Sequence, residues 1–215
     1  MSVYYAITNK KDGLQTSYMK SGLFNGKNDT YFPGNVFIDD PDCEPYCNYP
    51  WKEGYIITDL KHVFDTEFYR DYAYPKGDEY LMAVTLPTDD PSFRIISDGN
   101  RFWINKYIPG RMYDLYHVGT IAMMVDGGVN KEHILVKSAQ DGKIEAVKYL
   151  IENGADIHYN NDEALQISVK WNHIGVVKYL VENGADIWKI TDDDLKKNNN
   201  EYIVLYLRMK RLERM

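Results

Sequence analysis

The amino-acid sequence predicts an α+β domain over residues 1–129, followed by a short all-α solenoid over residues 130–215. Three observations support this division. One stretch occurs twice in the second part, both copies have the apolar spacing of a helix, and the first part differs in composition. Residues 1–129 contain all eight prolines and 14 of the 19 tyrosines, so the domain boundary is expected near residue 129.

The repeated stretch reads IEAVKYLIENGADI at residues 144–157 and IGVVKYLVENGADI at residues 174–187. The two copies agree at 11 of 14 positions. Apolar residues in each copy recur at the three- and four-residue intervals of one helix face. Each helix then meets Asn-Gly, which is a common helix ending because glycine readily adopts a left-handed conformation. A helix, a glycine stop and a short connection at a fixed period are typical of a solenoid.

About three units of paired helices are predicted in the solenoid. The predicted helices span about 131–140, 144–153, 162–170, 174–183 and 200–214, with a short helix that Thr191 caps. Asp141-Gly142 joins the first pair. Asn172 takes the place of Gly142 in the second pair, which is consistent because asparagine tolerates the left-handed conformation.

Residues 1–129 are predicted to combine strands with one or two helices in mixed order, which indicates an α+β domain. The predicted strands span 3–8, 36–38, 54–57, 80–86, 93–96 and 102–108. The last two form a hairpin about Asp98-Gly99-Asn100, and Pro109-Gly110 is predicted to end it. One helix is predicted to begin after Thr58 or Asp59, and another to span residues 114–125.

The charge balance argues against nucleic acid as a partner. The net charge is −7, and residues 1–129 carry 12 basic against 18 acidic side chains. Nucleic-acid binding requires clustered Lys and Arg. The basic residues within 207–215 are expected to complement a helix dipole at its C-terminal end rather than to bind phosphates.

No membrane partner is expected either, since no apolar run approaches the ~20 residues of a membrane span. The N-terminus lacks the apolar core of a signal peptide, and two cysteines do not form a disulfide framework. We therefore expect a cytoplasmic protein.

A family resemblance follows from the motif G-x-x-x-x-V-K-Y-L-x-E-N-G-A-D-I at Gly142–Ile157 and its counterpart from Asn172 to Ile187. It is similar to the second helix and exit of ankyrin repeats, so residues 131–215 resemble that family. The T-P-L-H-x-A opening of the family is not matched, and a period of 30 rather than 33 implies a shortened finger between repeats.

Two sequence motifs resemble those of the ankyrin proteins of mimivirus-like giant viruses: D-E-A-L and V-V-K-Y-L-V-E-N-G-A-D-I. In those proteins a non-repeat N-terminal domain precedes the repeats, and residues 85–94 and 105–110 look like that domain too. The sequence pattern of the third unit is weaker, which is expected because terminal repeats are often atypical where one side faces water. We expect the helix at 114–125 to pack on the first repeat as its N-terminal cap.

Catalytic and metal-binding patterns are weak. Cys43-x-x-x-Cys47 offers half of a zinc site, but a structural site needs four ligands and no histidine, His62 included, has ligand spacing, so two free thiols are favoured. Gly22–Asn28 departs from a P-loop in glycine spacing and in its last residue. The aspartate runs at 39–40, 89–90 and 192–194 are expected to cap turns and helix starts. No catalytic residue, metal ion or cofactor is therefore predicted.

The tyrosine clusters offer either a surface on which a ligand stacks or a core and rim that use tyrosine as a hydrophobic residue with a polar tip. The second interpretation is favoured. The clusters consist of Tyr69, Tyr72 and Tyr74, and of Tyr113 and Tyr116.

The resemblance implies a non-catalytic protein-interaction module, with a host or viral protein as partner. Stacked repeats present a concave face that fingers and first helices line. We expect the partner to contact His158, Tyr159, Asn160, Gln166, Lys170, Trp171, Trp188, Lys189 and Ile190.

Two of these residues mark the places where the copies differ. Trp188 stands where the first copy has His158, and Trp171 stands where it has Asp141. A bulky aromatic residue at an exposed position is typical of a contact anchor. Packing onto the neighbouring repeat is the equal alternative for both tryptophans.

Two other functions stay open at the level of sequence. The N-terminal domain could be an enzyme or bind a small ligand while the repeats recruit its target. Alternatively, the short array could have a structural role in which it caps or oligomerises the N-terminal domain.

Overall fold

The computed structural model describes residues 4–9, 55–64, 79–104 and 106–215. The chain divides into two compact units, Met1–Val129 and Asn130–Met215. Several sequence predictions lie outside the described residues: the strand at 36–38, the cysteine pair, the Gly22–Asn28 segment, Asp39-Asp40 and the tyrosines at 69, 72 and 74.

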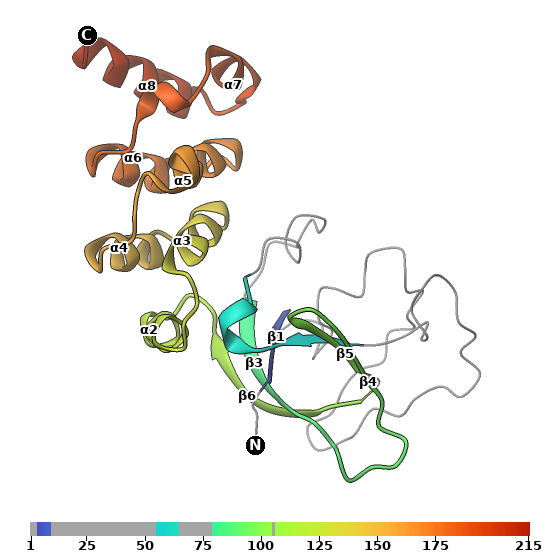
Figure 1. The fold of residues 1–215 in the computed structure, drawn as a ribbon. Coiled ribbons are helices and arrows are strands. Elements are labelled where there is room, and N and C mark those ends of the chain that lie inside the picture. Colours follow the sequence, from blue (N-terminus) through green and yellow to red (C-terminus); the bar gives the residue numbers. More distant parts are fainter. Residues whose placement is uncertain (1–3, 10–54, 65–78, 105) are drawn as a thin grey trace. The chain divides into compact units, whose positions relative to one another are not determined.

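The described part of the first unit is built on a six-stranded sheet (Figure 1). Its strands are β1 (Tyr4–Asn9), β2 (Tyr55–Thr58), β3 (Glu79–Thr85), β4 (Ile95–Asp98), β5 (Arg101–Ile104) and β6 (Ile108–Asp114). The spatial order is β4-β5-β2-β1-β3-β6, and all neighbours are antiparallel. Tyr5 lies opposite Ala83 across β1 and β3, and Ile57 lies opposite Phe102 across β2 and β5.

The core of this sheet is mainly aliphatic. Its buried cluster consists of Ala6, Ile57, Met82, Val84, Ile104 and Tyr107. Tyr4 packs at the edge of the cluster, where its ring meets Phe102 edge-on at 5.0 Å between centroids. Tyr113 and Tyr116 are half-buried, and the Arg111 guanidinium lies 5.1 Å from the Tyr113 ring centre. The described tyrosines therefore lie mostly at the rim of the core, which agrees with the favoured interpretation.

The hairpin is confirmed, but its predicted end at Pro109-Gly110 is wrong. Both residues lie inside β6, where Pro109 faces Val84 of β3. β6 is an edge strand, and the β3–β6 register shifts between Met82 and Val84. Proline is tolerated at such a place because edge strands and bulges do not need every backbone N–H for the ladder.

Both helices predicted in this unit are present, but each is shorter than predicted, and each begins directly after a residue whose side chain caps it. The Asp59 carboxylate accepts the His62 N–H at 3.0 Å, and the helix described after it is one 3-10 turn, η3 (Leu60–His62). The predicted helix at 114–125 starts later, since β6 includes Asp114. It is α2 (Val118–Asp126), and His117 Nδ1 accepts the Gly119 N–H at 3.1 Å.

Asp90 confirms that an aspartate run caps a turn. Its carboxylate accepts the Ser92 N–H at 2.8 Å and the Ser92 hydroxyl at 2.6 Å, and it pairs with the buried Lys106 ammonium at 3.1 Å. These bonds, with the Ser92 hydroxyl contributing most, lower the pKa of Asp90 to about 2. The aspartate therefore stays ionised and holds the turn after β3.

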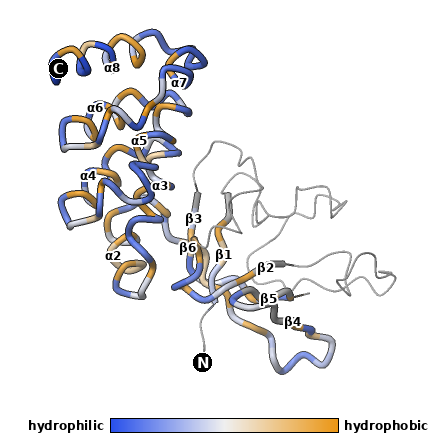
Figure 2. Tube along the Cα trace, turned by 45° about the horizontal axis from the view of Figure 1, so that its top comes forward, coloured by the Kyte–Doolittle hydropathy of each residue, from blue (hydrophilic) through white to orange (hydrophobic). Residues whose placement is uncertain are grey.

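The second unit is a stack of helix pairs (Figures 1 and 2). Its elements are α3 (Lys131–Gln140), α4 (Ile144–Glu152), α5 (Tyr159–Lys170), α6 (Ile174–Glu182), η4 (Ile187–Lys189), α7 (Asp192–Lys197) and α8 (Glu201–Glu213). All the helices predicted for this part are confirmed within a few residues. The first helices of the two pairs, α3 and α5, pack on each other. Each of them also packs on the second helix of its own pair, α3 on α4 and α5 on α6.

The Asn-Gly helix endings have the same geometry in both copies. Gly154 has φ +77°, and the Ala155 N–H donates to the Leu150 carbonyl at 2.9 Å. The Asn153 side-chain amide donates to the Tyr149 carbonyl at 2.7 Å. The equivalent bonds recur at the end of α6 in the second copy. This ending satisfies carbonyls that the helix leaves open and sends the chain into the next finger.

The turn between the helices of each pair also needs a left-handed residue. Gly142 has φ +68° and Asn172 has φ +64°, so the predicted equivalence of the two is confirmed. His173 Nε2 donates to the Gln140 carbonyl at 2.8 Å, and its ring thereby lies against Gly142. A Cβ atom on Gly142 would lie 2.4 Å from His173 Nδ1. The contact joins the helix pair α3–α4 to the helix pair α5–α6, and it leaves no space for a side chain at Gly142.

We expect Gly142→Ala to destabilise the array by about 2 kcal/mol or more, because it combines left-handed strain with displacement of His173. Gly175→Ala is the matched control. Gly175 lies in α6 with open space around it, so alanine there should stabilise the helix by about 0.5–1 kcal/mol. Urea unfolding followed by helical circular dichroism measures both. Equal midpoints for Gly142→Ala and the wild type would contradict the packing described here.

Candidate functional site

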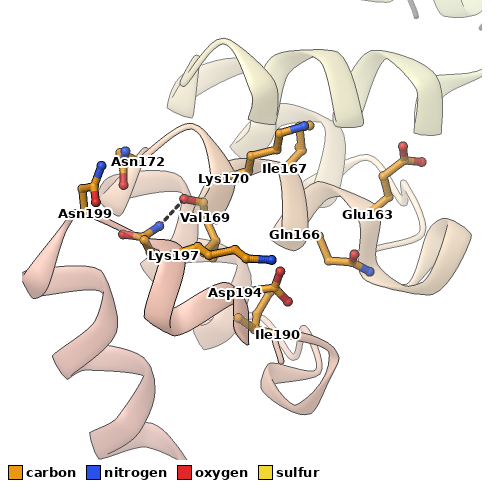
Figure 3. Close-up of a pocket in the computed structure, with 11 residues that line it drawn as sticks. Glu163, Gln166, Ile167, Val169, Lys170, Asn172, Ile190, Asp194, Lys197 and Asn199 are labelled. Carbon is orange, nitrogen blue, oxygen red and sulfur yellow. Dashed lines mark hydrogen bonds between the residues drawn. The ribbon is translucent and has the colours of Figure 1, made fainter. Parts of the chain in front are cut away.

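An open groove of about 570 Å³ lies between α5 and the α7 region (Figure 3). Three of the predicted contact residues, Gln166, Lys170 and Ile190, line it. The other lining residues are Glu163, Ile167, Val169, Asn172, Asp194, Lys197, Asn198 and Asn199.

The inner wall of the groove is apolar and fixed. Ile190 and Val169 are buried, and Ile167 is half-buried. The Val169 carbonyl accepts the Asn198 side-chain amide at 2.6 Å, which ties the end of α7 to the end of α5. Ile190 therefore serves the core and offers a partner only a small part of its surface.

The rim of the groove is polar, with both signs of charge. Figure 3 shows Gln166 on α5 across from Asp194 and Lys197 on α7. Asp194 accepts the Thr191 hydroxyl at 2.6 Å and the Thr191 N–H at 2.8 Å, and these bonds lower the pKa of Asp194. Lys197 pairs with Asp193. Within the described residues, the exposed Lys170 has no ion-pair partner, so its ammonium is available to a carboxylate or carbonyl of a bound protein.

The first residues of α5, which belong to the finger that follows α4, have an unusual, non-helical backbone. Asn160, Asn161 and Asp162 are all left-handed, with φ of 47°, 64° and 60°. Asparagine and aspartate tolerate this region, but three in succession store strain that surrounding bonds must offset. The Asn160 amide donates to the Glu163 carboxylate at 2.7 Å, and the Gln166 amide donates to the Asn161 carbonyl at 2.7 Å.

Asp162 holds this finger in place. It is only 2% exposed, and one carboxylate oxygen accepts the Asp186 N–H at 2.8 Å. His158 Nδ1 lies 3.1 Å from the same oxygen, while most of the His158 side chain is exposed. The Tyr159 hydroxyl lies 2.9 Å from His133 Nε2 on α3. His158 and Asn160 are thus presented to solvent, and Tyr159 is tied to the neighbouring helix.

Sequence reasoning missed Asp162 and His133 as residues that position the finger. One signal was available for Asp162. At the equivalent place in the first repeat, Glu132 accepts the Asp156 N–H at 3.3 Å. An acidic residue therefore recurs at this position in both repeats.

Trp188 and Trp171 have different surroundings. Trp188 lies in η4 with 54% of its surface exposed, and the Arg211 guanidinium carbon lies 5.2 Å from its ring centre. Arg211 is itself fixed by the Asp192 carboxylate at 2.8 Å and by the carbonyl of Ile190. Trp188 is therefore an exposed aromatic ring that a fixed cation orients. Lys189 beside it is exposed as well.

Trp171 is half-buried at the end of α5. In the first repeat the equivalent residue is Asp141, whose carboxylate pairs at 2.8 Å with the buried Lys137 ammonium. In the second repeat, Ile167 stands in the place of Lys137 and Trp171 in the place of Asp141. An apolar pair thus takes the place of an ion pair. This exchange favours packing over partner contact for Trp171.

The basic C-terminal residues have structural partners. Arg214 donates to the Val181 carbonyl at 2.9 Å and to the Ala185 carbonyl at 3.4 Å. Arg211 donates to the carbonyls of Ile187 in η4 and of Ile190 just after it. These cations therefore complement the C-terminal end of a neighbouring helix, a role that leaves their guanidinium groups engaged.

Neither a membrane span nor a cluster of metal ligands is found in the described part of the chain. Among these residues no helix is both long and apolar enough to cross a membrane. In the same part of the chain, no three His, Cys, Asp or Glu side chains gather as metal ligands would.

Comparison with protein families matches residues 112–191 to the family described as Ankyrin repeats (3 copies). The chain is also 30% identical over 178 residues to the ankyrin repeat protein R868 of Acanthamoeba polyphaga mimivirus, a match that covers 80% of this chain and 78% of the relative. The chain belongs to the ankyrin-repeat family. A second relative, ankyrin repeat protein R896 of the same virus, is 32% identical over 83 residues, covering 36% of this chain and 25% of the relative. No solved structure matches the chain.

Two features of these matches bear on the ankyrin array. Because the match to R868 covers 80% of the chain, the similarity extends beyond the repeats into the first unit. The family match also begins at residue 112 and so includes α2, which precedes the helix pairs α3–α4 and α5–α6 in the chain. Ankyrin repeats in general mediate binding between proteins, so the chain carries a protein-interaction module.

We expect Trp171→Ala to lower the free energy of unfolding by about 2 kcal/mol, because it removes a half-buried aromatic side chain. Trp188→Ala should change it by less than about 1 kcal/mol, since an exposed ring over a cation contributes little to folding. Urea unfolding of the two variants measures the difference. A loss as large for Trp188→Ala as for Trp171→Ala would show that Trp188 is a packing residue.

We also expect residues 112–129 to be needed for a stable ankyrin array, because a repeat unit depends on neighbours to bury its faces. Fragment 112–215 should unfold cooperatively, and fragment 130–215 should show a broad transition or none. Thermal unfolding followed by circular dichroism compares the two. A sharp transition in the shorter fragment, at the same temperature, would contradict a capping role for the added residues.

Proposed function

We propose that this chain is a non-catalytic adaptor whose ankyrin array binds a host or viral protein. The surface involved is the α5–α7 groove together with the two fingers, the connections around residues 158–161 and 187–190. The single observation that carries the proposal is the open groove along α5. Trp188, which is exposed and held by Arg211, precedes the lining residue Ile190 by two positions in the chain.

The chemistry of this surface suits a protein ligand. The half-buried Ile167 offers a small apolar contact for a side chain, and the Gln166 and Asn199 amides offer donors and acceptors to a polypeptide. Lys170 supplies an available cation at the rim. Aromatic and charged residues around a desolvated centre are the usual composition of binding hot spots.

Acid–base and nucleophilic chemistry has little support at this surface. Asp194 is engaged with Thr191, and Glu163 with Asn160. The described core of the first unit is packed with apolar side chains, so no specific observation there favours an enzyme. The similarity to proteins of Acanthamoeba polyphaga mimivirus makes an amoebal or viral protein the first partner to seek.

We expect the immobilised full chain to capture a discrete protein from amoebal lysate, with or without viral infection. A Lys170→Glu, Trp188→Ala double variant should reduce recovery of that protein by at least about tenfold, as expected for the loss of a hot-spot residue. The reason is loss of both the available cation and the exposed aromatic ring.

Lys148→Glu is the matched control, since Lys148 lies on α4, outside the groove, in a surface pair with Glu145 that contributes little to stability. Its recovery should equal that of the wild type. Unchanged recovery by the double variant would contradict the assignment of the surface. Failure of the wild type to capture any protein from either lysate would contradict the proposed function itself.

A further inference from the structure

Helix α8 exposes a narrow apolar stripe that no described element of the array covers. Tyr202, Leu205, Met209 and Leu212 are 80%, 59%, 52% and 73% exposed. Four exposed apolar side chains on one helix therefore indicate a surface that another molecule covers.

The opposite side of α8 explains which face is turned outward. Ile203 and Leu207 are buried, and Arg211 and Arg214 bond to carbonyls of η4 and of the α6 end. These residues share one side of the helix, since they lie four, four and three residues apart. The helix is thus fixed to the array through this side, and the apolar stripe faces away from it.

The spacing of the stripe indicates what kind of partner fits. Residues 202, 205, 209 and 212 are separated by three, four and three residues, which is the alternation of the a and d positions of a coiled-coil heptad. Leu205 and Leu212 occupy d positions, where leucine favours two-stranded coiled coils. A stripe of this width matches another helix better than a flat surface or a broad core.

The charges beside the stripe identify that helix as a second copy of α8. In this heptad frame Arg208 occupies a g position and Glu213 the e position that follows it. In a parallel pair of helices, a g residue of one helix lies beside the next e residue of the other. Arg208 of each copy would then meet Glu213 of the other copy, twice in a symmetric pair.

An antiparallel pair is less favourable. It would place the two Arg208 side chains opposite each other near its centre, and like charges there repel. The bond between Lys210 and Glu213 Oε2, at 2.7 Å, engages one carboxylate oxygen and leaves the other available for Arg208.

We propose that α8 is a self-association surface through which two copies of this chain pair by their α8 helices, parallel about a two-fold axis. The pairing is independent of the proposed partner groove between α5 and α7. It has a functional consequence, because two copies present two grooves and bind a multivalent target with avidity.

The thirteen residues of α8 supply less than two full heptads, so the interface is small and the dimer weak. We expect a dissociation constant on the order of 10–100 µM. Sedimentation of the full chain should show an average mass that rises above the 25.1 kDa of the monomer as concentration increases through this range. A mass that stays at the monomer value up to about 500 µM would overturn the proposal.

A Leu205→Glu, Leu212→Glu double variant should remain monomeric with an unfolding midpoint near that of the wild type, because both side chains are exposed in the monomer. Lys148→Glu, a surface change on α4, should dimerise as the wild type does. If the leucine variant dimerises like the wild type, α8 is not the interface.

Charge exchange tests the parallel arrangement. Arg208→Glu alone and Glu213→Arg alone should each weaken self-association at least about tenfold, since each places like charges together. An equimolar mixture of these two variants should restore dimers, and so should one chain that carries both changes. Single variants that self-associate as the wild type does, or a mixture that stays monomeric, would overturn the proposed pairing.

Discussion

The buried carboxylate of Asp162 is the interaction on which the partner-facing part of this array depends. It accepts a hydrogen bond from the Asp186 backbone at 2.8 Å and lies within 3.1 Å of His158 Nδ1. One group thereby joins the start of α5, the finger before it and the exit of α6. An unpaired carboxylate at this depth would be unfavourable, so the surrounding donors and the carboxylate require one another.

The strained finger follows from this arrangement. Three left-handed residues in succession persist only where the surroundings over-determine their conformation. Here the Asp162 bonds act on one side, and the bonds of Asn160 to Glu163 and of Gln166 to Asn161 act on the other. The first repeat has only a longer bond at the equivalent place, in which the Asp156 N–H donates to Glu132 at 3.3 Å. The second repeat is therefore the more specialised of the two, and it is the one that borders the groove.

How far the sequence predicts this structure depends on how local the cause is. The Asn-Gly endings, the Gly142–Asn172 equivalence and the Thr191 cap arise from neighbouring residues, and the structure confirms them. The place of Pro109 in β6 depends instead on pairing with β3 at a sheet edge, and β3 is distant in sequence. Burial of Asp162 likewise depends on Asp186. The difference between Trp171 and Trp188 depends on which residues of other elements reach each ring, and neither spacing nor composition contains that information.

The C-terminal helix shows the same dependence in another form. From sequence, the basic residues of α8 suggest a dipole effect. In the structure Arg211 and Arg214 lie on the attached side, where they bond to carbonyls that α6 and η4 leave open. Guanidinium groups are suited to this because they bond to several carbonyls while their stems pack against apolar surface. Ile203, Leu207 and the two arginines thus attach α8 to the array, and Tyr202, Leu205, Met209 and Leu212 take no part in this attachment. Apolar side chains that stability does not require, held at coiled-coil spacing on a fixed helix, are best explained by binding to another helix.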